Sequence, residues 1–266
     1  MEIIGYIAAS LIGISLGLIG GGGSILTLPV LVYLLGVDVV SSTAYSLFVV
    51  GATSLVGAIP KYRSGLIHMK TAIIFGIPSI IAVYLTRSFI VPAIPDVIFS
   101  IGDFAVTKAF LLMFLFAILM VVASYSMITG NGKEEKETKI DDLKYNYPMI
   151  LLEGSVVGIL TGLVGAGGGF LIIPALVLLS KLPMKMAVGT SLLIIAAKSL
   201  FGFAGDLGKT TMDWPLLLNV TALAIVGIFI GNFLSTKIDS NKLKKAFGWF
   251  VLLMGAYIII KEVYFR

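Results

Sequence analysis

The chain has 266 residues, of which 58% are hydrophobic and 12% are charged, and its formal net charge is +5. Because soluble domains carry about 25% charged residues, this composition excludes an ordinary soluble protein and indicates a polytopic membrane protein. The absence of cysteine and the single histidine exclude thiolate chemistry and a His-rich metal site, and we expect no metal and no cofactor. We attribute the positive charge to lysine-rich loops that face anionic lipid, so the expected partner is the bilayer and not nucleic acid.

The first apolar stretch, residues 3–37, is too long for one membrane span and too short for two. As a single helix it would run about 52 Å, whereas the hydrocarbon core of a bilayer is about 30 Å thick. Four glycines at 20–23 divide the stretch, and glycine loses the most backbone entropy in a helix. The pattern therefore predicts a helix over 3–19, a glycine break inside the membrane, and a half-helix over 25–36.

The remaining apolar stretches of the first half predict spanning helices at 41–59, 71–86 and 109–129. A basic loop at 61–70 joins the first two. The stretch 87–108 holds two prolines and two aspartates, and we expect it to form an interfacial connection or a short amphipathic helix.

The hydrophilic segment 130–146 follows and is expected to be a linker. It divides the chain into a first transmembrane repeat, 1–129, and a second, 147–266.

The second half repeats the plan of the first. Its predicted elements lie at 147–164, 170–180, 186–204, 214–236 and 247–261. A shift of 145 positions aligns the halves without a gap and matches Gly13, Gly17, Gly20, Gly22, Gly23, Pro29, Ser46 and Ser54 with Gly158, Gly162, Gly165, Gly167, Gly168, Pro174, Ser191 and Ser199. We infer a duplicated all-α fold in which each repeat has a glycine-broken or re-entrant helix pair and about three spanning helices.

The distribution of lysine and arginine predicts that the two repeats are inverted in the membrane. The loop 61–70 is basic, whereas its counterpart 206–215 is not; the loop 237–245 is basic, whereas its counterpart 92–100 has no lysine or arginine. Because positive loops face the cytoplasm, the bias changes side between the halves, as inverted repeats require. We therefore expect 61–70, 130–147 and 237–245 in the cytoplasm and both termini outside.

The two glycine clusters are the strongest candidates for a binding site. The first N–H groups of a helix have no internal partners and carry the positive end of the helix dipole, and glycine lets an anion approach them. In inverted repeats, two such half-helix ends would converge near the membrane midplane. The candidate residues are Gly22, Gly23, Ser24, Gly167, Gly168, Gly169 and Phe170. The alternative is that the glycines only permit close helix packing, which suits Gly13, Gly17, Gly158, Gly162, Gly227 and Gly231.

Ser46 and Ser191 occupy matched positions in the helix that follows each half-helix, and their hydroxyls are candidate donors to an oxyanion. The alternative is that each hydroxyl bonds its own helix backbone.

Lys198 is the only lysine or arginine that we expect inside an apolar span. A charge there needs a partner or a wet cavity, so Lys198 is a candidate for attracting the anion. The alternative is that it extends toward Asp206 near the end of the helix. Glu153 is a candidate to pair with Lys198 or to carry a coupled proton; otherwise it lies at the interface.

The glycine clusters at 20–24 and 165–169, each followed by an apolar run with a proline, and the Thr190-Ser191 pair resemble the TauE/SafE family of sulfite exporters over essentially the whole chain. The first half departs at Tyr45, which stands where the second half has Thr190. The resemblance implies transport of sulfite, thiosulfate or an organosulfonate across the cytoplasmic membrane, and it adds Thr190 to the candidate site.

We therefore expect a secondary transporter that exports a small sulfur-containing anion by alternating access around the glycine clusters. An anion channel and a non-transporting scaffold or accessory subunit are the alternatives. No catalytic motif such as HExxH occurs in the spans, so an enzyme is not expected. The sequence leaves open whether the chain forms a homo-oligomer.

Overall fold

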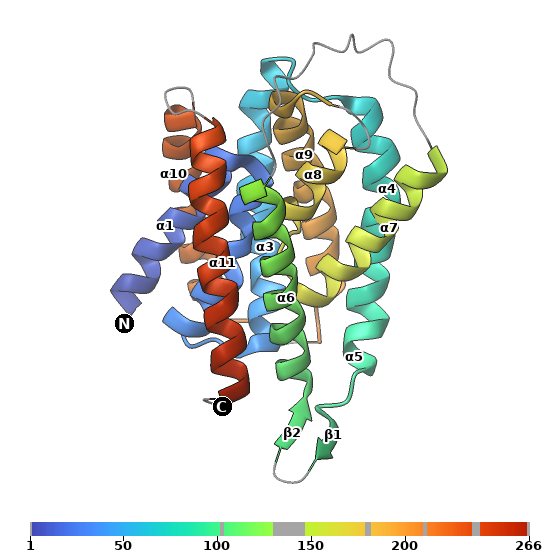
Figure 1. Cartoon of the computed structure of the whole chain (residues 1–266), viewed down its shortest axis with the longest axis vertical. Coiled ribbons are helices and arrows are strands. Elements are labelled where there is room, and N and C mark those ends of the chain that lie inside the picture. The colour runs from blue at the N-terminus through green and yellow to red at the C-terminus, as the bar shows by residue number, and fades with distance from the viewer. Residues whose placement is uncertain are drawn as a thin grey trace.

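Helices form nearly all of the described chain in a computed structural model, which covers residues 2–101, 104–129, 147–178, 182–209, 212–235 and 240–264 (Figure 1). The first half contains α1 Glu2–Ile19, η1 Gly20–Leu26, α2 Thr27–Pro29, η2 Val30–Leu34, α3 Val39–Arg63, α4 Met69–Leu85, η3 Thr86–Ile90, α5 Val91–Ala93, β1 Val97–Ile101, β2 Phe104–Thr107 and α6 Lys108–Thr129. The second half contains α7 Tyr147–Val164, α8 Gly169–Leu178, α9 Met184–Ala204, α10 Trp214–Ser235 and α11 Ser240–Tyr264. The linker predicted at 130–146 lies outside the described residues.

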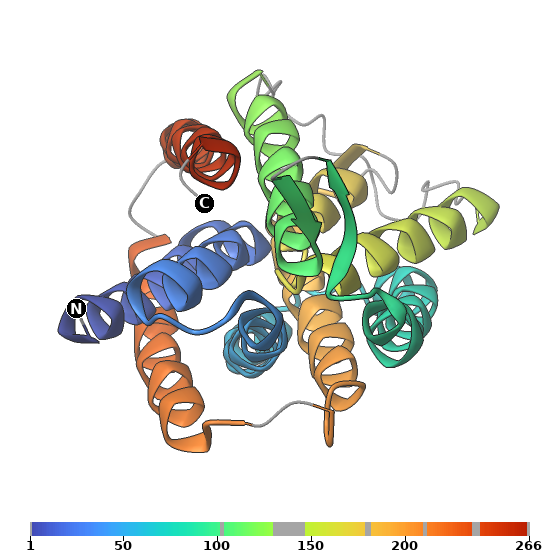
Figure 2. The same cartoon turned by 90° about the horizontal axis from the view of Figure 1, so that it is seen from below.

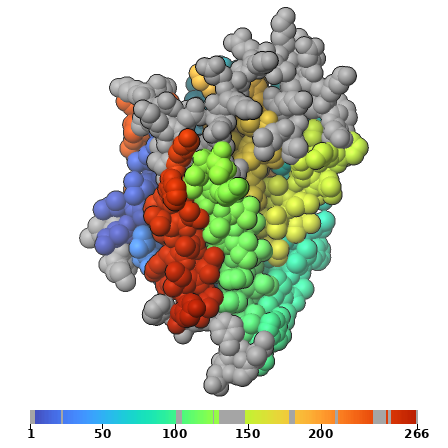
Figure 3. All heavy atoms as spheres, viewed as in Figure 1, coloured from blue at the N-terminus to red at the C-terminus, as the bar shows by residue number. Residues whose placement is uncertain are grey.

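Within the described residues, five helical segments are long and apolar enough to cross a membrane. They are Val39–Arg63, Met69–Ala93, Lys108–Thr129, Met184–Ala204 and Trp214–Ser235, with shorter apolar helices at Ile4–Ile19, Gly23–Leu34 and Pro148–Val164. The lateral face in Figure 3 shows α11, α6 and α7 beside one another, and these helices expose large apolar side chains. Examples are Leu253, Trp249, Tyr257, Tyr125, Val122 and Leu152. This is the surface of a multi-pass membrane protein, and the all-α prediction is confirmed.

Both glycine clusters interrupt the α-helical run, as predicted, but in different ways. The second break follows the prediction, because Gly165, Gly167 and Gly168 have positive φ and α8 begins at Gly169. In the first, Gly20 has φ +71° and ends α1, but the following glycines form the 3₁₀ helix η1 instead of an open turn. Short 3₁₀ turns are common at helix ends. The half-helix predicted over 25–36 is therefore a mixed helical segment that ends at Leu34.

The prediction for 87–108 is wrong in its first part. The helix α4 continues through the π-helical η3 and through α5, so a single segment runs from Met69 to Ala93. Only then does the chain turn into the antiparallel pair β1 and β2. The helix can carry Arg87 into the bundle because that side chain forms a buried ion pair with Asp206.

The helices of the two halves interlock. Seen from below, α3 and α9 lie side by side at the centre, between α10 and α4 (Figure 2). The helix α1 packs on α10, and α7 packs on α4. A Cβ added to Gly13 would collide with the carbonyl oxygen of Ala224, and a Cβ added to Gly158 would lie 2.6 Å from that of Ser79. Gly158 lies 145 positions after Gly13, and Ala224 lies 145 positions after Ser79, so the two contacts follow the register of the duplication.

The connections predicted to be cytoplasmic lie at one end of the bundle. Five parts of the chain lie toward the top of Figure 1: the α3–α4 connection, the end of α6, the start of α7, the end of α10 and the start of α11. The β1–β2 hairpin and the chain end of α11 lie at the opposite end. The positive-inside prediction requires these connections to share one side of the membrane, and this arrangement agrees with it. The inversion of the repeats and the division into 1–129 and 147–266 stay predictions.

Candidate functional site

The two glycine clusters meet inside the bundle. The backbones of Gly21 in η1 and Gly169 in α8 are in direct contact, and a Cβ on Gly169 would collide with Gly21. A Cβ on Gly167 would meet Val50 and would lie 3.4 Å from the Cβ of Ser24. The structure therefore brings together candidate residues of both halves that are far apart in sequence.

Lys198 reaches the second cluster from α9. Its side chain is fully buried, and its Nζ donates a hydrogen bond of 2.8 Å to Thr161 Oγ1 on α7. The same Nζ lies 2.8 Å from the position that a Cβ on Gly168 would take. Glycine at this position thus leaves room for the ammonium group, and a larger residue would displace it.

Among the residues that the structure describes, Lys198 has no carboxylate within ion-pair distance. Asp206, toward which the alternative interpretation extended Lys198, pairs with Arg87 instead. Glu153 is not the partner of Lys198 either. Glu153 lies two turns before Thr161, about 12 Å along the axis of α7, and is half-exposed.

The start of α8 also offers free donors. The Gly168 carbonyl accepts from the N–H groups of Leu171 and Ile172 at 3.0 and 3.1 Å, and the Gly168 N–H donates to Ala166 at 2.7 Å. In the described part of the chain, no backbone acceptor is found for the N–H groups of Gly169 and Phe170. These are the first N–H groups of a ten-residue helix, and such groups favour an anion.

The remaining glycine candidates pack closely. Gly22 and Gly23 lie in η1, where a Cβ on Gly23 would collide with Ser15 and Leu16 of α1. The Oγ of Ser24 donates to the Gly21 carbonyl at 2.8 Å. The packing alternative also holds for Gly13, Gly17, Gly158, Gly162, Gly227 and Gly231, whose added Cβ atoms would all collide with a neighbouring helix.

The hydroxyl candidates divide into different roles. Ser191 donates to the Val188 carbonyl of its own helix at 2.8 Å, as the alternative interpretation states. Thr190 Oγ1 accepts from the backbone N–H of His68 at 2.9 Å and so anchors the start of α4. Ser46 Oγ is buried without a hydrogen-bond partner in the described structure. Tyr45, where the first half departs from the second, accepts from the N–H of Asp213.

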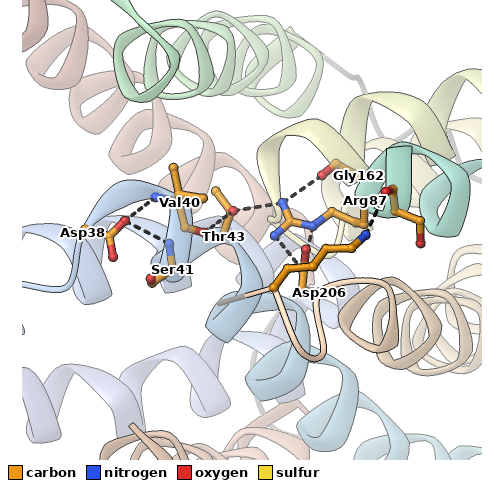
Figure 4. A network of polar contacts seen from close by, with 9 residues as sticks. Asp38, Val40, Ser41, Thr43, Arg87, Gly162 and Asp206 are labelled. Atoms are coloured by element: carbon orange, nitrogen blue, oxygen red, sulfur yellow. Dashed lines mark hydrogen bonds and ion pairs between the residues drawn. The ribbon is translucent and has the colours of Figure 1, made fainter. Parts of the chain in front are cut away.

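Sequence reasoning missed the most extensively bonded side chain of this region, Arg87. It is 1% exposed; its Nε donates to Asp206 Oδ2 at 2.7 Å, and its Nη2 lies 2.6 Å from the same oxygen. Its Nη1 donates to Thr43 Oγ1 at 2.9 Å and to the Gly162 carbonyl at 3.2 Å (Figure 4). The expectation that Lys198 is the only cation inside a span is therefore wrong. The available signal was an arginine within an apolar run, which the prolines that follow it obscured.

Lys198 and Arg87 contact consecutive residues near the end of α7. Lys198 binds the side chain of Thr161, and Arg87 binds the carbonyl of Gly162. Asp206 neutralises Arg87, which leaves Lys198 without a counter-charge in the described part of the chain. A buried charge is costly unless it is paired, so this site is suited to an incoming anion.

Known proteins are similar to this chain over nearly its whole length. A family model described as "Sulfite exporter TauE/SafE" matches residues 6–258. A "Probable membrane transporter protein" of Xylella fastidiosa strain 9a5c is 29% identical over 95% of this chain and 92% of its own. "Probable membrane transporter protein YdhB" of Bacillus subtilis is 29% identical over 89% and 91%, and "Probable membrane transporter protein MJ0441" of Methanocaldococcus jannaschii is 27% identical over 97% and 94%. No solved structure matches the chain significantly.

Proposed function

Because the chain belongs to the TauE/SafE sulfite exporter family, we propose that this membrane transporter moves a small sulfur-containing anion, sulfite in the first instance, out across the cytoplasmic membrane. Thiosulfate and small sulfonates are the other members of the proposed substrate class. They share a full negative charge and several oxygens that accept hydrogen bonds.

The observation that carries the proposal is the environment of Lys198. Its ammonium group is fully buried beside Gly168, with one hydroxyl partner and no carboxylate in the described structure. The N–H groups of Gly169 and Phe170, for which the described residues offer no backbone acceptor, start the adjacent helix. An oxyanion placed between them would neutralise the lysine and accept from the helix start, where the dipole also favours negative charge.

The contact between the two glycine clusters is where alternating access would move the two halves relative to each other. Gly21 and Gly169 belong to different halves and touch without side chains between them. Rocking one half against the other would separate this contact and expose the anion site to one side at a time. A carrier of this kind shows saturable exchange, whereas the alternative of an anion channel shows flux that does not saturate.

Radiolabelled sulfite exchange in proteoliposomes tests the proposal. We expect saturable uptake that internal unlabelled sulfite stimulates. Lys198→Ala should lower uptake roughly tenfold or more, because a hydrogen bond to a charged group contributes about 1.5–3 kcal/mol. Lys185→Ala is the matched control, since Lys185 is exposed on the same helix. Parental uptake in Lys198→Ala would remove the lysine from the site, and uptake linear in sulfite concentration would favour the channel.

A further inference from the structure

Asp206 is the one buried carboxylate among the described residues, with 4% of its surface exposed. It follows α9 directly, and it receives both the Nε and the Nη2 of Arg87. The guanidinium stays charged at any physiological pH, so the carboxylate is the partner that can lose its charge, by taking up a proton.

The contacts of Arg87 fasten the two halves together. Arg87 in η3 and Thr43 in α3 belong to the first half, while Gly162 in α7 and Asp206 belong to the second. Figure 4 shows the guanidinium group between these partners. Any rocking of the halves that separates α4 and α9 at this level must break the ion pair.

The ion pair lies at one end of the transport path. Arg87 is 18 residues after the start of α4, and so about 27 Å from the basic 61–70 connection. The predicted orientation makes this the outer end. It is also next to the anion site, because Gly162 follows Thr161, the partner of Lys198.

The other end has no equivalent ion pair in the described structure. The shift of 145 positions places Asn232 opposite Arg87 and Lys61 opposite Asp206. The Asn232 amide is buried, and both its nitrogen and its oxygen lack a hydrogen-bond partner in the described part of the chain. Among the described residues, a buried charge pair of this kind therefore occurs at one end of the bundle and not at the other.

We propose that the Arg87–Asp206 ion pair is the outer gate of the transporter and that protonation of Asp206 opens it. The proton adds to a carboxylate oxygen and makes Asp206 neutral, which removes the Coulombic attraction that holds Arg87 across the two halves. The freed guanidinium then lies beside the anion site and attracts the anion together with Lys198. The inference rests on the proposed function, because it assigns the proton-coupling residue of that same site.

Burial raises the pKa of the Asp206 carboxyl above its ordinary value of 3.8, and the cations around it oppose this shift. Besides Arg87 on η3, Lys209 in the same turn and Lys108 at the start of α6 face the carboxylate. The Nζ of Lys209 donates to the Ser88 carbonyl at 2.7 Å, which fixes the turn against η3. All three cations favour the ionised carboxylate. Glu153, a candidate coupling residue from the sequence, has no ion pair in the described structure and serves as the comparison.

The absence of cysteine allows a direct accessibility test. Ser46→Cys places a single thiol on α3, three residues beyond Thr43, and it sacrifices no hydrogen bond because Ser46 Oγ has none in the described structure. Ser100→Cys, exposed on β1, is the reference for reagent chemistry and orientation. A membrane-impermeant methanethiosulfonate is added outside proteoliposomes of each variant at pH 7.5 and 5.5. The rate of thiol modification in Ser46→Cys is then divided by the rate of thiol modification in Ser100→Cys.

We expect this ratio to rise at least tenfold at pH 5.5 in the parent protein. With Asp206→Asn the ratio should be high at both pH values, whereas Glu153→Gln should keep the parental pH response. The double variant Arg87→Gln with Asp206→Asn leaves no unpaired charge, so it tests the same point if the single variant does not fold. A parental pH response in either Asp206 variant would overturn the proposal.

Sulfite exchange distinguishes a failure of the proposed gate from a failure of the proposed transport function. At equal pH on both sides, Asp206→Asn should still exchange labelled sulfite, but it should lose accumulation driven by a pH gradient. Failure of exchange in the parent would contradict the proposed substrate. Intact exchange together with undiminished gradient-driven accumulation in Asp206→Asn would contradict only the gate.

Discussion

Two of the buried cations, Arg87 and Lys198, have different partners inside the bundle. Arg87 has a carboxylate, a hydroxyl and a carbonyl, whereas Lys198 has a single hydroxyl among the described residues. Removing one partner from a buried ion pair costs about 3–5 kcal/mol, because the remaining charge is left uncompensated. The same physics makes Arg87 a fixed structural group in this conformation, and it is the reason why we propose Lys198 as the group that attracts the anion.

His68 gives a pH-dependent prediction at the residue scale. Its side chain caps α4 by accepting from the Thr71 N–H, and burial, with a smaller contribution from Lys70, lowers its pKa below the ordinary 6.5. The folded state therefore favours neutral His68, so stability is complete above pH 6.5 and declines as the pH falls below that value. His68→Asn keeps a capping acceptor that does not titrate. Between pH 7.5 and 5.5, the thermal unfolding temperature in detergent should fall less for this variant than for the parent protein. An equal fall in both proteins would contradict the role assigned to His68.

Single residues were predictable only where their surroundings in sequence were uniform. Lys198 stands within an uninterrupted apolar stretch, so its place inside a span was predictable from the sequence, but its partner was not. Arg87 precedes Pro92 and Pro95, which suggested an interface, and its burial depends on Asp206, 119 residues away. The hydrogen-bond partners of the hydroxyl groups could not be predicted either. Ser191 donates to a carbonyl one turn earlier in its own helix, whereas Ser46, at the matched position, has no partner in the described structure.

At the scale of helices, glycine contacts set how closely α1 packs on α10 and α7 on α4. A Cβ at Gly13 or Gly158 would meet the backbone of the neighbouring helix, which cannot move aside as a flexible side chain can. We expect Gly13→Ala and Gly158→Ala each to lower stability by about 1–3 kcal/mol, the usual cost of overpacking. Gly76→Ala in α4 is the matched control, since its Cβ would meet only Ile194 at 3.9 Å.

Thermal unfolding of these three variants checks the prediction. Gly76→Ala should be neutral or more stable, because alanine favours a helix by about 0.5–1 kcal/mol over glycine. Equal stability of all three would mean that the interhelical contacts can relax. The existence of these glycine contacts was predictable from small-residue spacing, but their partner helices were not, because each lies in the other half of the chain.

At the scale of the whole molecule, apolar length and glycine position predicted most of the fold. The all-α membrane architecture, both helix interruptions and the shared end of the predicted cytoplasmic connections followed from the sequence. The interlocking of α1 with α10 and of α4 with α7 did not, since hydrophobic patterns identify spans without specifying their neighbours. The extension of α4 to residue 93 was missed because prolines were expected to stop it.

Equilibrium binding to the purified protein tests the anion site most directly. Sulfite, thiosulfate, sulfate and a small sulfonate are titrated against the parent, Gly168→Ala and Gly36→Ala. The two glycines have nearly equal φ, +68° and +69°. A Cβ on Gly168 would lie 2.8 Å from Lys198 Nζ, whereas a Cβ on Gly36 would meet none of the described atoms within 4 Å. We predict saturable binding of a sulfur oxyanion to the parent and to Gly36→Ala, and its loss in Gly168→Ala. Unchanged affinity in Gly168→Ala would contradict an anion site beside Gly168. A folded parent that binds none of the four anions would contradict the proposed transport of a sulfur oxyanion.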